Sequence, residues 1–172
     1  PGLRQALLGN TRADVRWRSA QVLTQLRDSA ARPELHRAVT DWNASVRHQA
    51  ILALGQVGNA TTVPLLRKRV QDPQETLANR GAALGALGNL GDPAAEADLV
   101  KAYGDARDEP DLRRQAIAAL WELRRVVPRD RLVASFRKAL SDPDPGVARR
   151  AAIACGELRD AGALTSLARL LD

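Results

Sequence analysis

The same apolar pattern occurs five times along the 172-residue chain. In each copy, apolar or small residues follow the spacing i, i+4, i+7, i+8, i+11, which is one face of an α-helix. Successive copies are offset by 31, 33, 33 and 35 residues, and they begin at Val15, Val46, Asn79, Leu112 and Val147. This period predicts stacked helical repeats, because a single repeat of that size cannot bury its apolar face alone.

A second, shorter apolar pattern follows each first one. Prolines stand in its first turn, where a missing N–H removes no helical hydrogen bond; they are Pro33, Pro64, Pro93 and Pro128. Asp92 and Asp160 can cap the exposed amides at two of these starts. The pattern ends at an aspartate in every repeat: Asp41, Asp72, Asp105, Asp142 and Asp172. Each repeat is therefore predicted to be helix A, a tight turn, helix B and a short loop.

Stacking these repeats predicts an all-α fold, a right-handed α-solenoid of about five helix-turn-helix repeats. We expect one domain over residues 1–172, with a remnant helix at 1–8 and repeats at about 11–41, 42–72, 73–108, 109–142 and 143–172. Neither end of the sequence has the polar capping repeat that a solenoid normally needs. We therefore expect the domain to be part of a longer protein.

Charge and composition exclude several classes of protein. The net charge is +6, from 26 Lys and Arg against 20 Asp and Glu. Residues 1–86 hold 12 basic and 6 acidic side chains, whereas residues 87–172 hold 14 of each, so any attraction for anions belongs to the first half. The lone Cys155 cannot form an internal disulfide. No apolar run reaches the roughly 18–20 residues of a membrane span, so we expect a cytoplasmic protein without membrane insertion.

Two segments carry a family resemblance. Residues 45–58 read SVRHQAILALGQVG, and residues 86–92 read ALGNLGD. Both resemble the HEAT repeat, in particular the short bacterial HEAT-like type first named after phycobilisome lyases. The resemblance covers nearly the whole chain and implies an armadillo-like superhelix. Members of this group include protein–protein scaffolds, bilin lyases, a metal-dependent hydroxylase of a modified lysine and, more distantly, DNA glycosylases.

The hydroxylase branch implies His-Glu pairs that bind iron. In this chain His36 is followed by Arg37 and His48 by Gln49, and the sequence contains no His-Glu dipeptide. Two histidines on different helices, with no carboxylate beside them, are poor ligands for a non-haem iron centre. No nucleophile elbow, Walker loop or dinucleotide fingerprint occurs either. We therefore predict no metal, no cofactor and no enzymatic activity.

Arginines recur at the start of helix A in four repeats: Arg16, Arg47, Arg80 and Arg113. Asp41 and Asp72 lie a few residues upstream of two of them. Recurrence at one position predicts structural ties between repeats, in which each guanidinium binds carboxylates or free carbonyls of the turns. An anion-binding stripe is the alternative.

A second basic row lies in helix B, and all three lysines of the chain belong to it. Its members are Arg37, Lys68, Lys101, Lys138 and Arg169, with Arg67, Arg69 and Arg137 beside them. Each of the first four precedes an aspartate by four residues, which predicts local pairs in the last helical turn. Helix B usually lines the concave side of a HEAT-type solenoid. The row would then face a ligand, and we predict partner-binding residues at Arg37, Arg67, Lys68, Lys101, Arg137, Lys138 and Arg169.

The tryptophans divide into two groups. Trp121 stands where other repeats have Gly55 or Gly88, and it is predicted to pack inside, as is Cys155. Trp17 and Trp42 are possible aromatic contacts, because exposed Trp next to Arg is typical of binding hot spots.

These observations favour a non-enzymatic protein–protein interaction scaffold that binds a partner with an acidic surface on its concave helix B face. One alternative is nucleic-acid binding through a basic concave groove, as in a HEAT-like DNA glycosylase, for which Trp42, Asp41 and Arg47 form the one suggestive cluster. The other is a bilin-lyase-like chaperone, which the resemblance alone allows.

Overall fold

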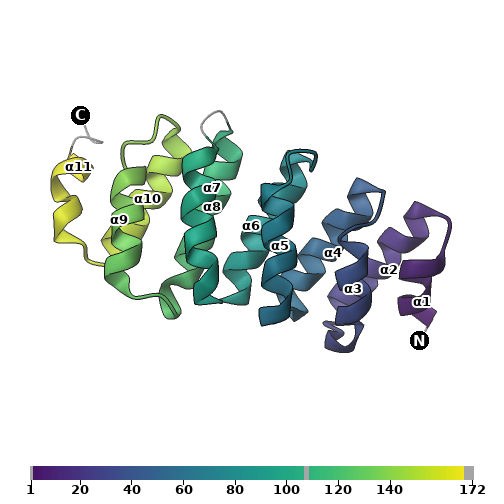
Figure 1. Cartoon of the computed structure of the whole chain (residues 1–172). Coiled ribbons are helices and arrows are strands. Elements are labelled where there is room, and N and C mark those ends of the chain that lie inside the picture. Colours follow the sequence, from purple (N-terminus) through teal and green to yellow (C-terminus); the bar gives the residue numbers. More distant parts are fainter. Residues whose placement is uncertain (1, 107–108, 169–172) are drawn as a thin grey trace. The chain divides into compact units, whose positions relative to one another are not determined.

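The computed structural model describes residues 2–106 and 109–168, and every regular element in these ranges is a helix (Figure 1). The predicted all-α repeat fold is confirmed. The chain divides into two compact units, residues 1–90 and 91–172, and we describe each by itself. None of the described helices combines the length and the apolarity that a bilayer crossing requires.

Unit 1 contains six α-helices among its described residues, and two short 3₁₀ turns at Ser29–Ala31 and Ala60–Thr62. The α-helices are α1 (Gly2–Gly9), α2 (Ala13–Gln25), α3 (Arg32–Ala38), α4 (Ala44–Val57), α5 (Val63–Gln71) and α6 (Leu77–Leu90). Helix α1 lies where the remnant helix was predicted. Helices α2, α4 and α6 are the A helices, and α3 and α5 are the B helices, which form a separate layer in front of them (Figure 1).

Unit 2 contains the other helices of the described chain, with 3₁₀ turns at Pro93–Ala95, Leu123–Arg125 and Ala161–Ala163. Its α-helices are α7 (Glu96–Asp105), α8 (Pro110–Glu122), α9 (Arg129–Ala139), α10 (Pro145–Glu157) and α11 (Leu164–Ala168). Helices α8 and α10 are A helices, whereas α7, α9 and α11 are B helices. The predicted A and B elements are therefore present in chain order.

Small residues let the A helices of unit 1 approach closely. Helix α4 packs against both α2 and α6, and its Ala50 and Ala53 are fully buried. A Cβ atom built on Gly55 of α4 would lie 3.0 Å from the Cα of Ala86 in α6. Leucines such as Leu54 and Leu87 fill the remaining core, and both are fully buried. Close helix contact thus explains why the chain has only 3% aromatic residues.

Capping side chains shape the turn between helix A and helix B. Asp92 accepts a hydrogen bond from the amide of Ala94 at 2.9 Å, and Asp160 accepts one from Gly162 at 3.2 Å. Both were predicted to cap helix B, but each caps the 3₁₀ turn that precedes it. Asp28 and Asn59 do the same in the two turns of unit 1. The helix A to helix B connection is therefore a capped 3₁₀ turn rather than a plain loop.

Candidate protein-binding surfaces

Arg16 joins the loop before its repeat to the loop after it. Its Nε and Nη2 atoms donate to the carboxylate of Asp41 at 2.7 and 2.9 Å, and its Nη1 donates to the carbonyl oxygens of Asn10 and Thr11 at 2.9 and 3.1 Å. The hydrogen bond to Asp41 raises the pKa of Arg16. Burial raises the pKa of Asp41, but hydrogen bonds from Arg16 and the Asn43 amide, together with the positive charges of Arg16 and Arg47, outweigh burial and lower the pKa overall.

The equivalent arginines repeat this arrangement. Arg47 donates to both carboxylate oxygens of Glu75 at 2.8 Å and to the carbonyl of Asp41 at 2.8 Å. Arg113 donates to Asp142 at 2.8 and 3.0 Å and to the carbonyl of Ala106 at 3.0 Å.

Arg80 donates through Nε to the carbonyl of Val70 at 3.1 Å. The partner acids of Arg16, Arg47 and Arg113 lie after helix B of the same repeat. The upstream loop instead supplies backbone carbonyls. These guanidinium groups are therefore occupied within the fold.

The basic row is placed in both units. Arg37 and Lys68 are exposed at the ends of α3 and α5 in unit 1, and Lys101 and Lys138 are exposed on α7 and α9 in unit 2. Arg169 lies outside the described residues. Lys68 and the half-buried Arg67 line a shallow depression of about 380 Å³ on α5, together with Pro64, Gln71 and Asp72.

Three of the aspartates that follow the row, Asp41, Asp72 and Asp142, pair with arginines. Asp41 binds Arg16, Asp72 lies 3.3 Å from Arg69, and Asp142 binds Arg113. The Nζ of Lys138 lies 5.7 Å from the ring centroid of Tyr103. The lysines of the row are exposed, and the arginines already compensate the charge of these three aspartates.

Arg137 differs from the rest of the predicted binding row. Its Nε donates to Asp160 at 2.6 Å, and its Nη2 also contacts this buried carboxylate. The hydrogen bond from Arg137 lowers the pKa of Asp160. Since Asp160 caps the following 3₁₀ turn, Arg137 has a structural role in joining α9 to the last repeat.

Trp42 and Trp17 each carry an arginine against the indole. Trp42 is 74% exposed in the loop after α3, and the Cζ of Arg16 lies 4.9 Å from its ring centroid. Trp17 on α2 is half-buried, with the Cζ of Arg18 at 5.1 Å. In the cluster of Trp42, Asp41 and Arg47, Asp41 is held by Arg16 and Arg47 by Glu75. The nucleic-acid alternative stays a prediction, which a gel shift with duplex DNA at low salt would test.

Trp121 is not enclosed in the core. Its ring packs edge-on against Phe136, with ring centroids 6.2 Å apart, and the Cζ of Arg124 lies 4.3 Å from its centroid. The side chain is half-buried, and part of it lines a surface pocket between α8 and α10. Trp121 therefore packs against Phe136 as predicted on one side, while another part of the indole is accessible from the pocket.

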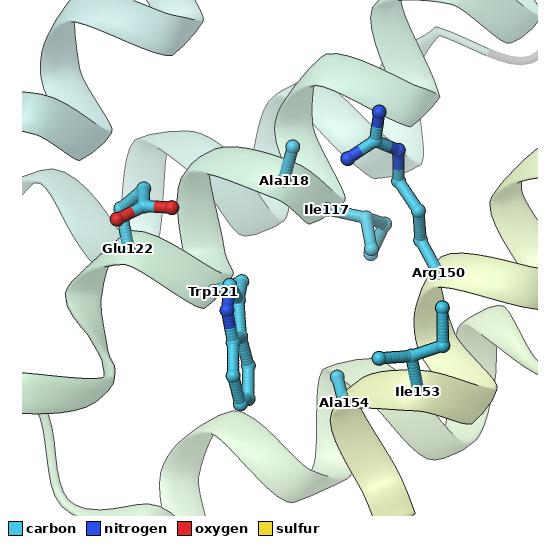
Figure 2. Close-up of a pocket in the computed structure, with 7 residues that line it drawn as sticks. All are labelled: Ile117, Ala118, Trp121, Glu122, Arg150, Ile153 and Ala154. Atoms are coloured by element: carbon cyan, nitrogen blue, oxygen red, sulfur yellow. The ribbon is translucent and has the colours of Figure 1, made fainter. Parts of the chain in front are cut away.

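We call this cavity the Trp121 pocket. Its volume is about 210 Å³, and it is lined by Ile117, Ala118, Trp121 and Glu122 of α8 and by Arg150, Ile153 and Ala154 of α10. Figure 2 shows Trp121 and Ile117 facing Ile153 and Ala154 across the opening, with the Arg150 guanidinium near Ile117. Ile153 is 55% exposed.

Two residues could have indicated this pocket from sequence. Trp121 replaces the glycine that Gly55 and Gly88 provide in other repeats. Ile153 is an aliphatic residue on the face of α10 that points to solvent. Trp121 departs from the repeat pattern and Ile153 is apolar at an exposed position, but only the fold places the two side chains on opposite sides of one cavity.

The histidines and the cysteine take part in packing. His36 Nε2 lies 2.9 Å from Thr62 Oγ1, and His48 Nδ1 lies 2.9 Å from Asn79 Oδ1. Burial lowers the pKa of His36. Cys155 is fully buried, as predicted, and burial raises its pKa. Within residues 2–106 and 109–168, no group of three or more His, Cys, Asp or Glu side chains could hold a metal ion.

Comparison of sequence profiles identifies the class of protein. The profile for HEAT repeats matches residues 1–79 and 105–172, and the profile for the PBS lyase HEAT-like repeat matches residues 80–105. The chain therefore belongs to the HEAT-repeat family. Compared with curated protein sequences, it matches none.

Solved structures provide two further likenesses. One is a chain in the complex of CpcE and CpcF of phycocyanin lyase from Nostoc sp. PCC7120, which is 25% identical with a TM-score of 0.74. The match covers 92% of this chain but spans only 64% of that chain. The other is human deoxyhypusine hydroxylase in complex with glycerol, 18% identical with a TM-score of 0.52, covering 99% of this chain and 88% of that one. The second likeness concerns the fold alone.

Proposed function

We propose that this chain is a non-enzymatic scaffold that binds a partner protein through exposed side chains of its HEAT repeats. The observation that carries the proposal is the likeness to a chain that occurs in a complex of two proteins, with a TM-score of 0.74 over 92% of this chain. Stacked repeats offer an extended surface, and binding to another protein is a common use of that surface.

Exposed side chains support this proposal. Trp42 and Ile153 leave large apolar areas on the surface, and such groups mark interaction sites when cations flank them. The exposed cations Arg37, Lys68, Lys101 and Lys138 favour a partner with an acidic surface. Arg137 is left out because its guanidinium binds Asp160. We place this function in the cytoplasm.

A selection with a phage library of random 12-residue peptides on the immobilised full chain tests the proposal. We expect enrichment of acidic peptides whose binding, measured by fluorescence anisotropy, weakens as salt rises. Lys68→Glu should weaken this binding, whereas Arg149→Glu on the A helix α10 serves as the matched control away from the B helices. Enrichment of the same peptides on a heat-unfolded chain, or no enrichment at all, would contradict a scaffold function.

A bilin-lyase-like role is a second candidate. It is supported by the match of residues 80–105 to the PBS lyase HEAT-like repeat and by the likeness to a phycocyanin lyase chain. The Trp121 pocket is smaller than the roughly 300–1,000 Å³ of small-molecule sites, so a bilin would bind across a surface. Adding a free bilin to the full chain should then shift the bilin absorption band. An unchanged spectrum at saturating protein would count against this role.

A further inference from the structure

We infer that the Trp121 pocket binds an apolar side chain of the partner protein that has a carboxylate next to it. This inference rests on the proposed scaffold function and specifies the chemistry of the partner at one place on unit 2. Three features of the pocket carry it: the fixed position of the indole, the size and lining of the cavity, and an uncompensated positive charge at one end.

The indole of Trp121 is held in place before any partner arrives. Phe136 of α9 packs edge-on against it, and the guanidinium of Arg124 covers part of the ring. Arg124 is itself anchored, because its Nη1 donates to the carbonyl of Trp121 at 3.0 Å. A rigid aromatic wall loses little side-chain freedom on binding, so contact with it contributes efficiently to affinity.

The cavity fits one side chain rather than a cofactor. Its volume of about 210 Å³ lies below the range of roughly 300–1,000 Å³ that small-molecule sites occupy. Ile153 and Ala154 of α10 supply an apolar lining opposite the indole, and Ile117 of α8 extends the apolar wall on the side of Trp121. Such a pocket resembles the sites that receive a single buried anchor at the centre of a protein interface.

The charge at the rim of the pocket determines which group of the partner can lie next to the buried apolar side chain. Arg150 lines the pocket, is exposed, and forms no ion pair with an acid in the described part of the chain. In contrast, Arg114 on α8 is compensated by Asp111 at 2.8 Å and by Asp144 at 3.2 Å. Glu122, the acid that lines the pocket, lies 3.7 Å from Arg124. The rim near Arg150 therefore complements a carboxylate.

Proton–nitrogen NMR of the full chain tests the pocket inference with two probes, 4-phenylbutyrate and 4-phenylbutan-1-ol. The two share one carbon skeleton, but the first ends in a carboxylate and the second in a neutral hydroxyl group. The chain has three tryptophans, so the indole signals of Trp17 and Trp42 serve as internal references. We expect 4-phenylbutyrate to shift the Trp121 signal alone, with a dissociation constant on the order of millimolar. The alcohol should bind at least about threefold more weakly, because it lacks the ion pair with Arg150.

Matched variants on α10 separate the apolar contribution from the charge. Arg150→Gln should weaken binding of the acid to the level of the alcohol and leave the alcohol unchanged. Arg149→Gln, the exposed neighbour, should change neither. Ile153→Asp should abolish binding of both probes while the far-ultraviolet dichroism of the folded chain is retained. Equal binding of acid and alcohol, equal effects of the two Gln variants, or an unmoved Trp121 signal would overturn the inference.

The outcome is separable from that of the phage selection. If selected peptides bind but 4-phenylbutyrate does not shift Trp121, the pocket inference is wrong and the scaffold function stands. If 4-phenylbutyrate binds as expected but no peptide is enriched, the scaffold function is wrong, and so is the partner assignment that rests on it.

Discussion

Arg16 and Asp41 form a two-pronged ion pair, with Nε–Oδ2 and Nη2–Oδ1 distances of 2.7 and 2.9 Å. Arg16 is only 4% exposed, and its remaining nitrogen binds the carbonyl of Asn10. One side chain therefore joins the loop before helix A to the loop after helix B.

Replacing Arg16 with Met should destabilise unit 1 by about 3–5 kcal/mol, because it leaves a half-buried carboxylate and two carbonyls without their donor. Urea unfolding of the full chain, followed by circular dichroism, measures the loss. Arg18→Met is the control, since Arg18 is exposed on the same helix and should cost less than about 0.5 kcal/mol. Similar losses for the two variants would refute a structural role of the ion pair.

The Glu75 carboxylate should make stability depend on acid pH. Burial raises its pKa, but hydrogen bonds from Arg47, the Thr76 amide and Asn79 outweigh burial and lower the pKa from 4.5 to about 2. Because the folded-state pKa is the lower one, this stabilisation is complete above the unfolded pKa of 4.5 and is lost as pH falls toward about 2.

The wild type should therefore be more stable than Glu75→Gln at about pH 5, and this difference in the free energy of unfolding should decrease by about 2 kcal/mol between about pH 5 and about pH 3. Denaturant unfolding at a series of pH values measures this difference. The matched control is Asp14→Asn, which removes an exposed carboxylate paired with Arg12 and should show little such dependence. A constant difference across the acid range would contradict the assigned pKa.

Two glycines in the middle of A helices should respond to alanine in opposite directions. A Cβ on Gly85 of α6 meets nothing within 4 Å, so Gly85→Ala should stabilise the chain by about 0.5–1 kcal/mol through helix propensity. A Cβ on Gly55 of α4 would lie 3.0 Å from the Cα and Cβ of Ala86. Gly55→Ala should therefore destabilise by about 1–2 kcal/mol through overpacking. Thermal unfolding measures both, and the same sign for the two would contradict close α4–α6 packing.

The sequence predicts the helices better than it predicts the partners of their side chains. Helix A positions such as Ala50, Leu54 and Cys155 are buried as the i, i+4, i+7, i+8 pattern indicates, because that pattern depends only on helix geometry. The sequence places the acid Asp41 just upstream of Arg47, but Asp41 gives Arg47 only its backbone carbonyl, and the acid that binds this guanidinium is Glu75. Its position depends on the course of the loop after α5, which periodicity does not specify.

The candidate site shows the same limit. Exposure of Trp42 and Lys68 follows from their places in a loop and on a helix end. The Trp121 pocket requires α10 to lie beside α8 so that Ile153 faces the indole. Arg137 occupies the same row as the binding candidates, yet Asp160, 23 residues later, draws it into an ion pair. Long-range contacts of this kind depend on how the helices pack.

Arg27 lies at a backbone position that favours glycine, and its replacement should stabilise unit 1. Its φ is 48°, its amide donates to Thr24, and the next amide donates to Leu23, which is the usual end of a helix in a left-handed residue. After α6, Gly91 has a φ of 64°. Arg27→Gly removes steric strain at the cost of chain entropy, for a net gain of about 0.5–1 kcal/mol, or about 1–3 °C in Tm. Arg27→Ala removes the same charge but keeps the strain, so calorimetry should find no gain for it; an equal rise in Tm for both variants would show that charge, not backbone strain, limits this helix end.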